Sequence, residues 1–332
     1  IDGEFERGNG ILVAGVDGVS IENITARNAL LNGFYWATVK GYRGSYLTAY
    51  NNGDYGVYAF DAVDGVLDHS YATGSPDAGF YIGQCYPCDA IVNNVVSEYN
   101  GLGYSGTNSG GSLYITSSIF RNNKGGLAPN TLDSELLPPE RETFIIGNLI
   151  ENNNNYNSPA TNSTYLSYGN GVVIAGGNNN IIKNNVIVDH DLYGVILTAA
   201  MDVNYWPAHG NRVEENLILS SRKADIAISG VSNLANCFEG NYFNTSIPPG
   251  LQALNGCEKN IIPLSADLSG LWSTIARLIY ANTGNFYQDD WRTLPAPEQQ
   301  ENMPIMQEII DANDDGQYEL GFYKYLPSFR KS

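Results

Sequence analysis

Short apolar segments recur along the chain, and a glycine opens each of them. Neighbouring glycines of the first run are spaced by 23, 23, 24 and 23 residues, and the same spacing of 23 returns later in the chain. Apolar and polar residues alternate in these segments, whereas helical spacing is absent. The pattern predicts an all-β fold, a parallel β-helix with about 23 residues per coil. The glycines are Gly33, Gly56, Gly79, Gly103, Gly126, Gly171 and Gly194.

A column of polar residues runs through the other half of each repeat. Apolar residues flank every member, which predicts a tight turn between two short strands. Asparagine tolerates left-handed turns, and its amide can donate to and accept from the same group one coil away. We interpret His69 and His190 as substitutes within such ladders rather than as catalytic groups. The column consists of Asn23, Ser45, His69, Asn94, Ser118, Asn148, Asn185, Asn216 and Asn241.

The hydrophobic content and the net charge of the chain limit the kinds of molecule that it can bind. The chain of 332 residues is 43% hydrophobic, and no run of eighteen apolar residues could span a membrane. A net charge of −18 argues against nucleic acid or anionic lipid as a partner of the whole surface. We expect a polysaccharide or other glycan instead. An acidic polysaccharide would require a local basic patch or bridging cations.

Four cysteines indicate an exported protein with two disulfides, located in the periplasm, at the cell surface or outside the cell. We expect Cys85 to pair with Cys88 across the turn QCYPCD, and Cys237 to pair with Cys257 near the end of the solenoid. A redox CxxC pair would require a βαβ context, which is absent, and a zinc site would require a second CxxC.

The repeat ends near residue 245, which divides the chain into a solenoid over 1–245 and a C-terminal part over 246–332. In the C-terminal part, apolar residues at helical spacing over 268–279 predict a capping helix, followed by an extended tail. The chain opens as if inside a coil, so we expect an N-terminal cap to be missing or supplied by another chain, with self-association at the solenoid ends as one possibility.

A calcium loop is one interpretation of the tail. Asp311, Asn313 and Asp315 precede Gly316 with the spacing of oxygen ligands at the start of such a loop. The twelfth position, where a complete loop needs a bidentate Glu, is Phe322. An ordinary turn is the alternative.

Three insertions interrupt the repeat, and two of them leave directly after the glycine-led strand. We expect that corner to collect polar side chains. Asp133 with Glu135 or Glu140 could serve glycoside hydrolysis. Arg141 with Tyr81 or Tyr104 and His209 could serve elimination or epimerisation of a uronate. The corner should gather Gln84, Asn108, Asn130, Asp133, Glu135, Glu140, Arg141, Asp202 and His209.

Tyr35, Tyr58 and Tyr81 each stand two residues after a repeat glycine and should stack as an outward ladder, while Phe34, Val57 and Phe80 point inward. Stacked tyrosines suit the faces of sugar rings. We therefore predict substrate contacts from these three residues together with Gln84, Asn108 and Asn130. A purely structural ladder is the alternative.

The stretches SPDAGFYIGQCYPC and GYSGTNSGG resemble those of bacterial exported right-handed parallel β-helix repeat proteins of the pectate-lyase-like superfamily, over about residues 10–245. The resemblance implies the fold and a right-handed coil. Superfamily members include lyases, epimerases, hydrolases and adhesins, and the epimerase pattern Asp-Pro-His-Asp is absent, so no catalytic residue is carried over. Two functions stay open: binding, with cleavage or epimerisation, of an acidic polysaccharide, and a non-catalytic envelope or extracellular scaffold.

Overall fold

The computed structural model describes residues 1–229, 235–258, 275, 279, 283 and 288–304. Contacts divide the chain into a first unit, Ile1–Gln299, and a second, Gln300–Ser332. The proposed calcium ligands Asp311, Asn313 and Asp315 lie outside the described residues. Only residues 275 and 279 of the expected capping helix are described, so that helix stays a prediction.

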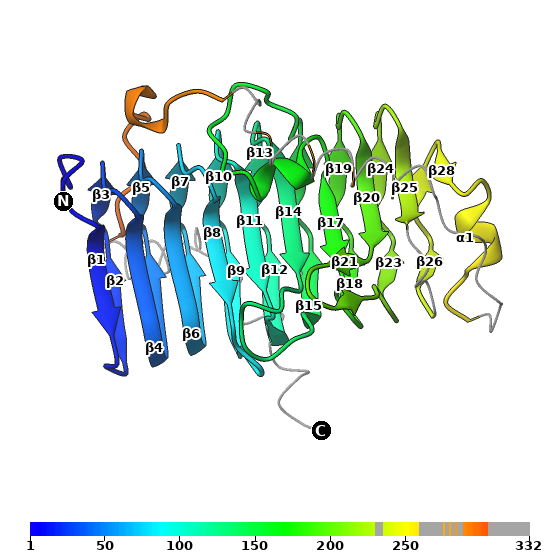
Figure 1. The fold of residues 1–332 in the computed structure, drawn as a ribbon, viewed down its shortest axis with the longest axis horizontal. Helices are drawn as coiled ribbons and strands as arrows, with labels where there is room; N and C mark the ends of the chain where they lie inside the picture. Colours follow the sequence, from blue (N-terminus) through cyan, green and yellow to red (C-terminus); the bar gives the residue numbers. More distant parts are fainter. Residues whose placement is uncertain (230–234, 259–274, 276–278, 280–282, 284–287, 305–332) are drawn as a thin grey trace, which may run out of the picture. The chain divides into compact units, whose positions relative to one another are not determined.

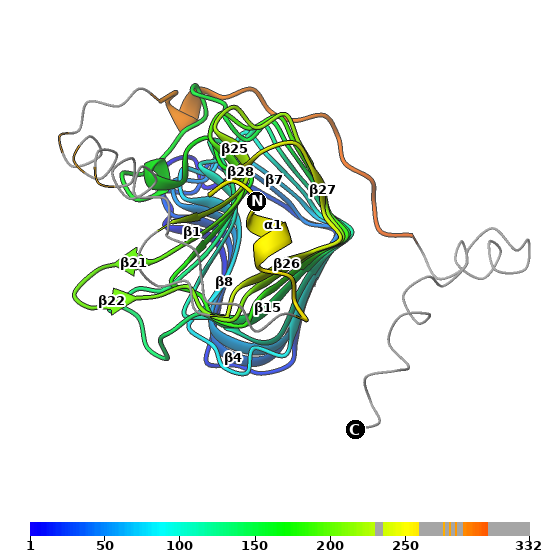
Figure 2. The ribbon, with the colours of Figure 1, turned by 90° about the vertical axis from the view of Figure 1, so that its right-hand side faces the viewer.

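The first unit is a parallel β-helix of about ten coils with about 23 residues per turn, as the spacing predicts (Figure 1). Viewed along the coils, three strand-bearing faces surround a narrow core (Figure 2). No helix among the described residues is long and apolar enough to cross a membrane.

Face 1 carries the glycine column. Phe34, Val57 and Phe80 align in register and are fully buried, as predicted. A Cβ atom at Gly56 would lie 2.6 Å from the Gly79 carbonyl oxygen, so the close approach of coils explains the glycine. The strands of face 1 are β1 (Asn9–Ala14), the first halves of β4 (Asn32–Ser45) and β6 (Tyr55–Asp68), β8 (Ala78–Gly83), β11 (Leu102–Thr107), β14 (Gly125–Asn130), β17 (Val172–Ala175), β20 (Tyr193–Thr198), β25 (Ala224–Ser229) and β28 (Ser246–Ile247).

Faces 2 and 3 follow face 1 in each coil. Strands pair in parallel with their equivalents one coil away on both faces. Face 2 contains β2 (Val19–Glu22), the second halves of β4 and β6, β9 (Ala90–Asn93), β12 (Gly110–Thr116), β15 (Arg141–Ile146), β18 (Ile181–Lys183), β23 (Arg212–Glu214) and β26 (Cys237–Glu239). Face 3 contains β3 (Thr25–Arg27), β5 (Thr48–Tyr50), β7 (Tyr71–Thr73), β10 (Val96–Glu98), β13 (Ile119–Arg121), β16 (Leu149–Glu151), β19 (Val186–Val188), β24 (Leu217–Leu219) and β27 (Tyr242–Phe243).

The predicted polar column is in fact two adjacent columns at the turn between faces 2 and 3. Asn23, His69 and Asn94 have φ of 55°, 46° and 55° and lie in the outer turn position. The inner position is buried and contains Ser118, Asn148, Asn185, Asn216 and Asn241. Ser45 belongs to neither, because it ends β4. A strict sequence period could not separate neighbouring positions once coils differ in length.

The inner column is a hydrogen-bonded ladder. Asn185 Nδ2 donates to Asn216 Oδ1 at 2.9 Å and to the Ile145 carbonyl oxygen at 2.9 Å. At the turn between faces 3 and 1, His190 takes a ladder position, and its Nδ1 accepts from the Asn153 N–H at 3.3 Å. Burial lowers the pKa of His190 to about 4, so a neutral imidazole fits the ladder, as predicted.

The C-terminal end of the coils is closed by α1 (Leu251–Leu254). Leu251 is fully buried, and Gln252 Oε1 accepts from Asn241 Nδ2 at 2.9 Å, which ends the ladder. Cys237 and Cys257 form one disulfide and Cys85 and Cys88 the other, as predicted. Strand pairing reaches Ile247, slightly past the predicted limit of the solenoid.

Candidate functional site

Two of the three insertions leave from the corner between faces 1 and 2, as predicted, and we call this the insertion corner. The loop over 131–140 follows β14, and the antiparallel pair β21 (Ala200–Met201) and β22 (Tyr205–Trp206) follows β20. Figure 2 shows the β21–β22 pair projecting from the coils.

Several predicted site residues tie these loops together. Gln84 Oε1 accepts from the Leu136 N–H at 2.8 Å, and Asn108 Nδ2 donates to the carbonyl oxygens of Leu132 and Glu135 at 2.7 and 2.9 Å. Asn130 Oδ1 accepts from the Thr107 hydroxyl at 3.0 Å. The amides of Gln84 and Asn108 are thus occupied in fixing the loop over 131–140, and that of Asn130 joins neighbouring strands of face 1.

Asp133 holds the β21–β22 pair. Its carboxylate accepts from the Asn204 N–H at 2.7 Å and from Trp206 Nε1 at 3.2 Å, and hydrogen bonds from Asn204 lower its pKa. In the other direction, the Asp202 carboxylate accepts a hydrogen bond from the Asp133 N–H at 2.8 Å. A carboxylate with a lowered pKa, bound to backbone and indole, is suited to anchoring rather than to proton transfer.

The prediction for Glu140 needs correction. Its side chain is fully buried and accepts from the Thr143 hydroxyl and from Asn180 Nδ2, each at 2.8 Å. Burial raises its pKa to about 8. Glu140 therefore lies at the end of a second Asn ladder, formed by Asn180, Asn211 and Asn236 at the turn between faces 1 and 2, and cannot flank a glycosidic bond with Asp133. The Pro-rich loop concealed this, because a surface excursion returns to the core at this residue.

Arg141 and His209 lie on the face 2 side of the insertion corner. Backbone bridges align Arg141 with Asn178 and Asn178 with His209, one residue per coil. The Arg141 guanidinium stacks 3.7 Å from the centre of the Tyr86 ring. Tyr104 faces the core and is fully buried, so the prediction of Tyr104 as a proton donor is wrong.

The tyrosine ladder forms on face 1. Tyr35, Tyr58 and Tyr81 are in register, with ring centres 4.6 and 4.8 Å apart. Tyr55 stacks on Tyr58 at 4.4 Å. Tyr35, Tyr55 and Tyr58 are partly exposed, whereas Tyr81 is 1% exposed. The ladder is thus open at its N-terminal rungs and closed at Tyr81.

Three carboxyl groups with raised pKa values lie along this ladder, Asp54 and Asp77 near Tyr55 and Tyr58, and Glu135 near Tyr58 and Tyr81. The Tyr81 hydroxyl lies 2.9 and 3.0 Å from the two carboxylate oxygens of Glu135. Burial raises the pKa of Glu135 to about 7. Asp54 and Asp77 occupy adjacent coils, where the Asp77 N–H donates to the Asp54 carbonyl oxygen at 3.0 Å. We call Asp54, Asp77 and Glu135 the acid cluster.

The two aspartates of the acid cluster differ in proton affinity. Burial raises the pKa of Asp54 to about 6. Burial and the charge of Asp54 raise the pKa of Asp77 to about 8, against a hydrogen bond from Tyr55 that lowers it. Near neutral pH, Asp54 is mostly ionised and Asp77 mostly protonated. Paired carboxyl groups with separated pKa values can act as a base and an acid.

Sequence analysis missed Asp54 and Asp77, because they belong to regular coils and not to an insertion. Their signal was the repeat itself: both stand two residues before a repeat glycine. It also missed Lys124, which is fully buried, donates to the Tyr156 carbonyl oxygen at 2.7 Å and faces the Tyr165 ring. Burial lowers the pKa of Lys124 to about 8. Lys124 anchors the second insertion, which contains η1 (Thr164–Ser167).

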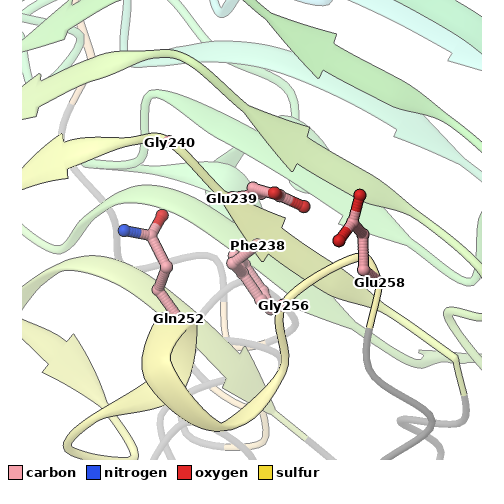
Figure 3. Close-up of a pocket in the computed structure, with 6 residues that line it drawn as sticks. All are labelled: Phe238, Glu239, Gly240, Gln252, Gly256 and Glu258. Atoms are coloured by element: carbon pink, nitrogen blue, oxygen red, sulfur yellow. The ribbon is translucent and has the colours of Figure 1, made fainter.

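A depression of about 200 Å³ lies at the C-terminal end of the coils. Figure 3 shows the carboxylates of Glu239 and Glu258 close to one another, with Gln252 on the opposite side. Nearby, Glu214 approaches Cys237 and Cys257, but these sulfurs form a disulfide and are not thiolate ligands. This depression belongs to the cap.

Comparisons with known proteins agree with the fold. Residues 4–136 match the family model of the right handed beta helix region. A mutant of the periplasmic alginate epimerase AlgG is similar in structure, with a TM-score of 0.51, 14% identity, and coverage of 67% of this chain and 50% of that chain. This chain thus spans half the length of AlgG.

The A-module of the mannuronan C-5 epimerase AlgE4 from Azotobacter vinelandii aligns with a TM-score of 0.36 and 15% identity, covering 71% of this chain and 80% of that chain. No curated protein matches the sequence significantly. Likeness at this identity concerns the fold alone. The parallel coils, the match over residues 4–136 and the likeness to AlgG show a right-handed parallel β-helix fold, in agreement with the prediction.

Proposed function

We propose that this protein is exported, binds an acidic polysaccharide along face 1, and acts on it by acid–base chemistry at the acid cluster. The observation that carries the proposal is the gathering of Asp54, Asp77 and Glu135, with pKa values of about 6, 8 and 7, beside partly exposed tyrosines. Clusters of perturbed titratable groups are typical of active sites.

Protonated carboxyl groups resolve the conflict between an acidic protein and an acidic ligand. A neutral Asp77 can donate a hydrogen bond to a uronate carboxylate, whereas an ionised one would repel it. Tyr35 and Tyr58 offer ring faces to the sugar. Two disulfides support export. The similar structure AlgG is described as a periplasmic alginate epimerase, which is consistent with this class of substrate.

In the proposed reaction, the Asp54 carboxylate removes the proton at carbon five of a uronate. The electron pair moves onto the sugar carboxylate, and a hydrogen bond from Asp77 stabilises that charge. In epimerisation, a second group donates a proton to the opposite face of carbon five, and Asp54 then releases the proton that it removed to water. In elimination, the electron pair instead forms the C4–C5 double bond and expels the glycosidic oxygen. Tyr58 is a candidate donor of the proton to carbon five in epimerisation or to the leaving glycosidic oxygen in elimination; burial raises its pKa, so its hydroxyl is protonated at neutral pH.

The test is to incubate the protein with a panel of polyuronates, with and without calcium, following proton exchange at carbon five and the ultraviolet absorbance of unsaturated sugars. Asp54→Asn should lower either rate at least about 100-fold, because it removes the base. Asp64→Asn is the matched control, since Asp64 is an exposed aspartate on β6, the strand that directly follows Asp54. Equal rates in both variants would contradict the assignment of Asp54.

The scaffold hypothesis keeps one specific observation in its favour. Face 3 exposes an apolar row across adjacent coils, in which Val186, Leu217 and Tyr242 are 38%, 37% and 67% exposed. Rows of this kind occur at interaction surfaces. If the wild-type protein neither binds nor converts any polyuronate of the panel, this second function is favoured.

A further inference from the structure

An open cleft lies next to the acid cluster, at the turn between faces 3 and 1. It encloses about 380 Å³, within the range of ligand sites. Gly53 and Pro76 line it, and they directly precede Asp54 and Asp77. The opposite wall comes from residues 288–292, which contain the start of η2 (Trp291–Thr293). The cleft therefore adjoins the proposed reaction site without containing it.

The wall over 288–292 is held in place by several contacts. The Asp289 N–H donates to the Asn157 carbonyl oxygen at 2.9 Å, and Gln288 Oε1 accepts from the Ala160 N–H at 2.8 Å. The Trp291 ring lies 5.6 Å from that of Phe5 and covers Gly53, where a Cβ atom would come within 2.8 Å of the ring. The segment is thus fixed to three parts of the solenoid.

Among the described residues that line the cleft, Arg292 is the one positively charged residue, beside the two acidic residues Asp289 and Asp290. Its guanidinium lies 4.8 Å from the centre of the Trp291 ring, and its Nη1 is 3.7 Å from Asp290 Oδ1. The side chain stays 50% exposed. A guanidinium has five donors, so one long contact to Asp290 leaves most of them available. Stacking on Trp291 orients the group before a ligand arrives.

We propose that Arg292 binds a carboxylate of the acidic polysaccharide, making this cleft a uronate subsite next to the acid cluster. The inference rests on the proposed function and adds the residue that supplies positive charge. The sequence offered Arg141 for uronate chemistry, and that residue stacks on Tyr86 at the insertion corner. Arginine is suited to the role because its planar donors match a carboxylate.

The experiment measures binding of a polyuronate and of a neutral polysaccharide to wild type and variants at low and high salt. Arg292→Gln should weaken polyuronate binding about tenfold at low salt, with little change for the neutral polymer, and Arg292→Lys should recover part of the loss. Trp291→Leu should weaken binding in the same direction. Arg222→Gln is the matched control, because Arg222 is a 77% exposed arginine paired with Asp191.

The outcomes separate the two proposals. If wild type binds no acidic polysaccharide, the proposed function fails. If wild type binds and Arg292→Gln behaves like Arg222→Gln, only the subsite is overturned. Thermal unfolding of each variant shows whether it is folded. An equal loss of affinity for the acidic and the neutral polymer would also overturn the charge-based role of Arg292.

Discussion

Single asparagine residues in the ladders hydrogen-bond buried polar groups of neighbouring coils to one another. Asn185 satisfies the Ile145 carbonyl oxygen and accepts from both the N–H and the Nδ2 of Asn148, all within 3.0 Å. Its neighbour Asn184 is exposed, with a φ of 55°. The Asn185 side chain thus hydrogen-bonds to buried groups of the preceding and the following coil. Asn184 contributes only its backbone conformation to the turn.

Asn185→Ala should destabilise the protein by about 2–4 kcal/mol, because it leaves the buried Asn148 N–H and Ile145 carbonyl oxygen of the preceding coil without side-chain partners. Asn184→Gly should change the free energy of unfolding by less than about 0.5 kcal/mol, since glycine accepts a positive φ. Chemical denaturation of the two variants checks this. Equal effects at both positions would contradict the ladder.

Sequence reasoning at the residue scale succeeded where period and chemistry agreed. His190 was expected as a ladder substitute and is one, and the inward set Phe34, Val57 and Phe80 is buried as predicted. It failed for Glu140 and Tyr104, because their charge or hydroxyl suggested an exposed site while their register placed them in the core. Register within an interrupted repeat depends on loop lengths, which composition does not reveal.

At the scale of elements, the C-terminal closure combines α1, the end of the ladder and the Cys237–Cys257 disulfide. The disulfide joins β26 to the segment just after α1, across 20 residues of sequence. A loop of that length restricts the unfolded chain appreciably.

The double variant Cys237→Ser, Cys257→Ser should lose about 2–4 kcal/mol of stability, with opening concentrated in the last coils. Hydrogen exchange resolved by segment measures this. The double variant Cys85→Ser, Cys88→Ser serves as a comparison. It removes a disulfide whose cysteines are only three residues apart in the sequence, so it should lower the stability by less. Uniform loss of protection along the solenoid in the first variant would contradict a local cap.

Insertions were a good guide to where loops gather and a poor guide to chemistry. The corner predicted from the insertions exists, and Gln84, Asn108, Asp133 and Asp202 meet there through the loops' hydrogen bonds. The acid cluster draws only Glu135 from that set. Its two aspartates lie on regular coils, where stacking of equivalent positions brings them together and no motif marks them.

At the scale of the whole molecule, the central question is how a protein of net charge −18 holds an acidic ligand. Sugar carboxylates are ionised above about pH 5, whereas Glu135 and Asp77 keep their protons up to about pH 7 and 8. Because the proposed complex needs the protonated forms, affinity should be present below these pKa values and fall as pH rises through them.

Binding of a polyuronate followed by calorimetry from pH 6 to pH 9 tests this account most directly. Affinity should fall about tenfold or more across the range in wild type, whereas Asp77→Asn, which stays neutral, should keep more of its affinity at pH 9. Affinity that stays constant or rises with pH, or an equal decline in Asp77→Asn, would contradict the acid cluster as the binding site.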